Sequence, residues 1–153
     1  MSDAVGAGWK VNTGTVAGSS GVSNGAASTK VSSGEEVKLQ AGDNLVIDQN
    51  GKTVSYSLNK DLTKMNSATF EATGGKTTVI KGDSIVQTDG TKVNTSTAGG
   101  NTVVDGTKST ATTADGTTVT SANGNTKYAA DGVRINTTGK NPVSLTDVGL
   151  DNG

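Results

Sequence analysis

The chain has 153 residues, 22 of them glycine, and its 13 Lys and Arg nearly balance 14 Asp and Glu, for a net charge of −1. It has no cysteine, which excludes disulfide bridges and thiolate metal ligands, and no histidine, the commonest general base and metal ligand. Leu, Ile, Val and Phe together number 28, which is few for the core of one globule, while the small net charge argues against disorder. The composition therefore indicates that hydrogen-bonded backbone ladders provide most of the ordered structure, and that several chains pool their apolar residues.

The N-terminal third is small and polar, apart from a lone tryptophan. Trp9 stands among Gly and Ala residues, and the sequence near it is too poor in large side chains to cover it. Residues 13–33, rich in Gly, Ser and Ala, read as loop or loose edge strand. We interpret Trp9 as a structural anchor at a subunit interface; the alternative is a residue that stacks on a carbohydrate or another ligand.

Residues 41–70 contain the clearest pattern in the chain. Asn50-Gly51, a strong hairpin signal, lies between Leu45-Val46-Ile47 and an alternating run, residues 53–58. The first run is apolar throughout, which predicts a strand buried on both faces or placed at an interface. Before the hairpin, residues 35–40 alternate as a half-buried strand.

A change of period after Ser57 predicts one short helix. Leu58, Leu62 and Met65 fall on one helical stripe, and Ser57 can cap the first turn. About ten residues form a stable helix only if the stripe packs on something. We expect that partner to be another copy of the chain.

Beyond Gly74-Gly75 the sequence becomes a series of short Thr- and Val-rich segments separated by turns. Asp-Gly or Asn-Gly pairs recur at residues 89, 105, 115, 123 and 131, an all-β rhythm. Predicted strands cover residues 77–81, 84–88, 117–121 and 133–137. A weak repeat joins the Asp-Gly-Thr runs at residues 89, 105 and 115. We place a domain boundary near residue 74.

Nothing in the sequence predicts an enzyme, a metal site or a cofactor. Most Asp residues lie beside Gly in turns, which explains them without catalysis. Gly74-Gly75-Lys76-Thr77 ends like a phosphate loop, but Phe70 stands where the motif needs glycine. Balanced charge and few aromatic residues argue against nucleic-acid binding. No apolar run is long enough to span a membrane, and residues 1–3 lack signal-peptide character.

Two groups of residues resemble the heads of trimeric autotransporter adhesins, surface proteins of Gram-negative bacteria. Gly8-Trp9-Lys10, with the pattern of residues 41–70, looks like the family's Trp-ring domain. Residues 132–136 and 143–153 look like the close of the domain named for a Gly-Ile-Asn signature, although Arg134-Ile135-Asn136 stands here instead. The resemblance assigns residues 1–74 to a Trp-ring-like domain and 75–153 to a GIN-like β-prism domain, ending before a neck. We therefore expect a piece of a longer protein.

The resemblance implies an all-β fold with one short helix, built as interleaved homotrimeric β-prisms on the bacterial surface, outside the outer membrane. Such heads attach to host cells and to extracellular-matrix proteins by multivalent contact. The residues expected at the trimer interface are Trp9, Leu45, Ile47, Tyr56, Leu58, Leu62 and Met65. No motif assigns ligand-binding residues.

Two other classes of protein stay open. The first is a purely structural spacer or a phage-type tail-fibre shaft, with a glycan-cleaving version disfavoured by the use of Asp in turns. The second is a monomeric bacterial sandwich spacer, which needs a richer alternating core than 28 Leu, Ile, Val and Phe provide.

Overall fold

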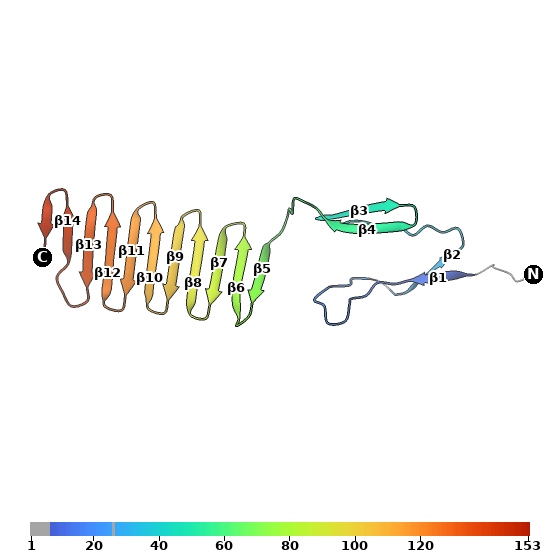
Figure 1. Ribbon diagram of the computed structural model, residues 1–153, viewed down its shortest axis with the longest axis horizontal. Coiled ribbons are helices and arrows are strands. Elements are labelled where there is room, and N and C mark those ends of the chain that lie inside the picture. Colours follow the sequence, from blue (N-terminus) through green and yellow to red (C-terminus); the bar gives the residue numbers. More distant parts are fainter. Residues whose placement is uncertain (1–6, 26) are drawn as a thin grey trace, which may run out of the picture. The chain divides into compact units, whose positions relative to one another are not determined.

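The computed structural model of the chain describes residues 7–25 and 27–153. These residues form fifteen β-strands and no helix, so the all-β prediction is confirmed (Figure 1). None of the described residues forms a helix long and apolar enough to cross a membrane. The chain divides into two compact units, Met1–Thr63 and Lys64–Gly153.

The first unit holds two separate two-stranded ladders. In the first, β1 (Gly8–Val11) pairs with the antiparallel β2 (Thr29–Ser32), which places Trp9 directly opposite Val31. Val31 is 7% exposed, and among the described residues it is the one hydrophobic residue that is buried. Trp9 itself remains 55% exposed, so most of its large surface still lacks a cover.

The second ladder is the predicted hairpin. Strands β3 (Leu45–Asn50) and β4 (Thr53–Leu58) pair antiparallel, with Asn50 opposite Thr53, so that the two loop residues are Gly51 and Lys52. Because side chains alternate across a strand, Val46 shares a face with Ser57, and the other face carries the larger apolar residues. The run of residues 45–47 is therefore not buried on both faces; the apolar character is concentrated on one.

The predicted helix over Leu58, Leu62 and Met65 is wrong. Residues 59–66 form bends and irregular backbone, and Asn44 makes hydrogen bonds to this segment. The Asn44 side chain donates to the Thr63 carbonyl at 2.9 Å and accepts from the Thr63 amide at 2.8 Å, and its own carbonyl accepts from Asn59 at 2.8 Å. Three backbone groups of residues 59–63 are thus bonded to one residue, Asn44. A stripe without a packing partner cannot offset the cost of helix nucleation.

Replacing Asn44 by alanine is expected to loosen residues 59–63. Two net hydrogen bonds are lost, worth about 1–3 kcal/mol together, and Asn44 has φ 66, which alanine disfavours. Asn44→Gly is the matched control, since it removes the same bonds but accepts the backbone conformation. Faster amide hydrogen exchange at Thr63 in both variants, larger in the alanine variant, is the expected result; unchanged exchange in both would contradict it.

The second unit is one antiparallel meander of eleven strands in sequential order from β5 to β15 (Figure 1). The strands are β5 (Ser67–Ala72), β6 (Lys76–Lys81), β7 (Ser84–Asp89), β8 (Lys92–Thr97), β9 (Gly100–Asp105), β10 (Lys108–Thr113), β11 (Gly116–Ser121), β12 (Gly124–Ala129), β13 (Gly132–Thr137), β14 (Val143–Thr146) and β15 (Gly149–Asp151). The four segments predicted as strands here lie in β6, β7, β11 and β13.

From β6 to β13 the meander repeats every eight residues, as six-residue strands joined by two-residue loops. The turn pairs seen in the sequence belong to two different classes. Asp89 and Asp105 end a strand and the following Gly opens the loop, whereas Asp115 and Asp131 lie in the loop and the following Gly opens the next strand. The third member of the apparent repeat is therefore not equivalent to the first two.

The structure divides the chain between Thr63 and Lys64, ahead of the boundary expected near residue 74. The reason is that β5 pairs along its whole length with β6, across the Gly74-Gly75 loop. The assignment of a Trp-ring-like and a GIN-like domain stays a prediction. The sheet is a single layer, and no residue described within it is a buried hydrophobic one.

Candidate interaction surface

The sheet of the second unit has one apolar face. Strand register places alternate residues of every strand on the same side of the sheet. Each large hydrophobic strand residue of this unit that is exposed, at 41–70%, falls on that side. We call this side the apolar face; the residues are Phe70, Ile80, Ile85, Val103, Val119, Tyr128, Ile135, Leu145 and Leu150.

The opposite face is built differently. It carries mostly Thr, Ser and Asn, four half-buried valines, and the charged Glu71, Lys81, Lys127, Arg134 and Asp151. Single exposed hydrophobic residues are common on proteins, but a contiguous face of them marks an interaction site. The asymmetry between the faces points to the apolar face as the surface that a partner covers.

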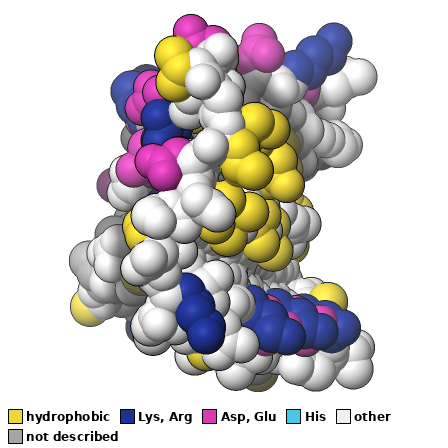
Figure 2. All heavy atoms as spheres, turned by 90° about the vertical axis from the view of Figure 1, so that its left-hand side faces the viewer, with side chains coloured by type: hydrophobic (Ala, Val, Ile, Leu, Met, Phe, Trp, Pro, Cys, Tyr) yellow, Lys and Arg dark blue, Asp and Glu magenta, His cyan; other side chains and the backbone are white. Residues whose placement is uncertain are grey.

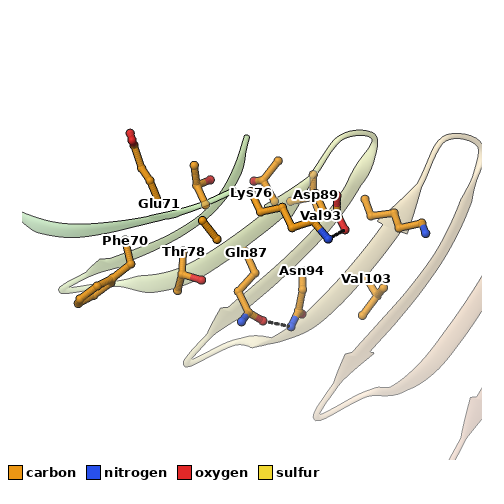
Figure 3. Close-up of a pocket in the computed structure, with 13 residues that line it drawn as sticks. Phe70, Glu71, Lys76, Thr78, Gln87, Asp89, Val93, Asn94 and Val103 are labelled. Carbon is orange, nitrogen blue, oxygen red and sulfur yellow. Dashed lines mark hydrogen bonds and ion pairs between the residues drawn. The ribbon is translucent and has the colours of Figure 1, made fainter. Parts of the chain in front are cut away.

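A row along the middle of the apolar face combines apolar and amide side chains. Figure 3 shows Phe70, Thr78, Gln87, Asn94 and Val103 side by side along an open groove of about 450 Å³. Asn94 Nδ2 donates to Gln87 Oε1 at 3.1 Å, and Asn94 Oδ1 is buried without a hydrogen-bond partner. The two amides interrupt the apolar row, so the lining of the groove is partly polar.

A ladder of alternating charge borders the apolar face near one set of turns. Successive strands from β6 to β10 place basic and acidic side chains next to each other; the residues are Lys76, Asp89, Lys92, Asp105 and Lys108. Lys76 Nζ lies 3.0 Å from Asp89 Oδ2 (Figure 3). Figure 2 shows such a row of basic and acidic side chains below the hydrophobic patches, which gather in a hollow.

The turn between β12 and β13 holds a second ion pair. The Arg134 guanidinium donates to both oxygens of Asp131, at 3.1 Å and 2.9 Å. These hydrogen bonds, together with the attraction between the two opposite charges, lower the pKa of Asp131 and raise the pKa of Arg134. The stability that the ion pair contributes is present above the ordinary pKa of a carboxyl group and is lost as pH falls through the lowered pKa of Asp131. The pair is exposed, so the contribution is small.

The interface residues predicted from the sequence lie in three places: in β1, in the β3–β4 hairpin, and in the segment after β4. Cross-strand pairing puts Leu45 opposite Leu58 and Ile47 opposite Tyr56, all four on one face of the hairpin. Trp9 lies in β1. Leu62 and Met65 lie in the bends after β4, both exposed, rather than on a helix. Ile47 is half-buried, and Leu45, Tyr56 and Leu58 are exposed.

The sequence prediction missed every residue of the apolar face in the second unit. The signal was present: strictly in-register six-residue strands make the positions of Val103, Val119 and Ile135 equivalent. It could be read only once the eight-residue period was recognised. Within residues 7–25 and 27–153, no group of three or more acidic side chains that could hold a metal ion is present.

Taken together, the fold and this surface define an all-β protein with a single-layer antiparallel sheet, of which one face is apolar and exposed. Part of the chain is 41% identical over 71 residues to the autotransporter adhesin NhhA of Neisseria meningitidis serogroup B, covering 43% of this chain and 11% of that protein. No family model matches the chain, and no solved structure matches it. The similarity supports the adhesin-type resemblance; the Trp-ring and GIN-type domains stay predictions.

Proposed function

We propose that the chain is part of the head of a trimeric bacterial surface adhesin, exposed outside the outer membrane. In this proposal three copies pack their apolar faces around a threefold axis as β-prisms. The interface also includes Trp9, the hairpin residues Leu45, Ile47, Tyr56 and Leu58, and Leu62 and Met65 of the segment that follows the hairpin. The assembled head attaches to host cells or matrix proteins.

The observation that carries this proposal is the uncovered apolar face. A single antiparallel layer normally packs one face on a core, and three sheets facing an axis provide such a core without another domain. The middle row, with Val103, Val119 and Ile135, would face that axis. The partial similarity to an autotransporter adhesin supports an adhesin-type protein.

The assembly is tested by the mass of the native chain in solution. We expect light scattering to give three times the 15.2 kDa of the chain, with a melting temperature that rises with protein concentration, because folding and association are linked. A particle of 15.2 kDa that melts cooperatively at all concentrations would refute the pooled core.

A structural spacer is the second candidate function. The eight-residue repetition from β6 to β13 favours it, because it extends a sheet by identical steps. Trimeric protein is applied to immobilised collagen, fibronectin and cultured host cells. Binding that grows with valency supports the adhesive function. If an intact trimer binds none of these surfaces, the result supports the function of a structural spacer.

A further inference from the structure

The two turn edges of the sheet formed by β5–β15 differ in charge. One edge carries Lys76, Lys92 and Lys108, interleaved with Asp89 and Asp105; we call it the lysine edge. The other carries four aspartates in its loops, beside Lys81 at the end of β6, and we call this row of aspartates the aspartate edge. Its residues are Asp83, Asp115, Asp131 and Asp147. All nine side chains of these two rows are exposed.

The two rows also share a period. The lysines stand on every second strand, at β6, β8 and β10. The aspartates stand in loops that join β6–β7, β10–β11, β12–β13 and β14–β15, so the loops of this edge also recur every second strand. At about 4.8 Å between strands, the lysines step by about 9.5 Å, and so do Asp115, Asp131 and Asp147. The β8–β9 loop, Ala98-Gly99, has no aspartate, so Asp83 stands two such steps from Asp115. One row can therefore meet the other at several successive points without a mismatch.

We propose that the lysine edge of one copy docks on the aspartate edge of the next copy around the ring, an inference that rests on the proposed trimer. In a threefold ring each contact joins two different edges of the same chain, whereas a twofold dimer can bring like edges together. Like charges at such a contact are unfavourable and opposite charges are favourable. The charge rows thus select head-to-tail closure, and the apolar face supplies most of the cohesion.

Only three of the four aspartates are suited to the test, because Asp131 is already paired with Arg134. The first variant is Lys92→Asp/Lys108→Asp, and the second is Asp83→Lys/Asp115→Lys/Asp147→Lys. The third combines all five changes. A matched control combines the first variant with Glu36→Lys/Asp48→Lys/Asp61→Lys, three exposed acids of the first unit that give the same total charge.

The combined variant isolates the contact between copies. Within one chain the two rows lie at opposite ends of six-residue strands, about 20 Å apart, well beyond the screening length of about 8 Å at physiological salt. Rescue of the lysine reversal by the aspartate reversal must therefore come from a neighbouring copy. We expect the lysine variant and the aspartate variant each to weaken trimer assembly about tenfold. We expect assembly to recover in the combined variant but not in the control, and the differences to be smaller in high salt.

The outcomes separate the two proposals. If the native chain is trimeric and the combined variant is no tighter than its control, the edge contact is wrong and the trimer stands. If the native chain is monomeric, the proposed function itself fails. Should the reversed variants not fold, the neutral set Lys92→Gln/Lys108→Gln and Asp83→Asn/Asp115→Asn/Asp147→Asn gives the same cycle; additive effects on assembly would overturn the inference.

Discussion

Replacement of Val119 by aspartate is expected to abolish trimer formation. Val119 is 46% exposed in the single chain, so a carboxylate there is tolerated by a monomer. In the proposed trimer three carboxylates would be buried near the axis, and an unpaired buried charge costs several kcal/mol. A loss of at least about 4 kcal/mol per trimer lowers the assembly constant by about a thousandfold. Light scattering over a dilution series measures it.

Thr120→Asp is the matched control for this variant. Thr120 follows Val119 by one position on the same strand and lies on the opposite face, across from Ser109 and Asn125. We expect the control to assemble like the native chain. If both aspartates weaken assembly equally, the effect belongs to the strand and not to the apolar face, and the orientation of the sheet in the proposed trimer is wrong.

Replacement of Gly124 by alanine is expected to destabilise the meander by about 3 kcal/mol. Gly124 opens β12 with φ 138, and an added Cβ would press on the backbone carbonyl of Asn136. That residue belongs to the β12–β13 ladder, opposite Asn125, so the carbonyl cannot move without loss of pairing. The measurement is the midpoint of chemical unfolding at fixed protein concentration.

Gly90→Asn is the control for the glycine variant. Gly90 lies in a loop with φ 60 and open space around it, and asparagine adopts such angles readily. The expected loss is below about 1 kcal/mol. An equal loss at both positions would mean that the left-handed backbone, rather than the close approach of the neighbouring strand, sets the requirement for glycine.

The hairpin and the strand-rich second unit could be predicted because their signals are local. Asn50-Gly51 and the recurring Asp-Gly pairs specify turns through the conformations that these residues accept. Between the turns, β-branched Thr and Val favour extended backbone. No long-range contact was needed to place the strands at residues 84–88 or 133–137.

The helix over Leu58, Leu62 and Met65 was predicted from the same kind of local signal and was wrong. Its stripe competes with the Asn44 side chain, which reaches the backbone of Thr63 across nineteen positions of sequence. Periodicity does not report such a contact. The hint available in the sequence was asparagine at position 44, after Gly42-Asp43, because asparagine is one of the few residues that accept the positive φ found there.

The sequence by itself determined that the chain is all-β, lacks the side chains for common catalysis, and is too poor in large apolar residues for a core of its own. Only the tertiary structure decided where those residues lie. Alternation across strictly in-register strands gathers Phe70, Val119, Ile135 and their neighbours on one face, and the strand period places Lys76, Lys92 and Lys108 at the same edge of the sheet. The physical reason is register: one residue of slip would move each of these side chains to the other face.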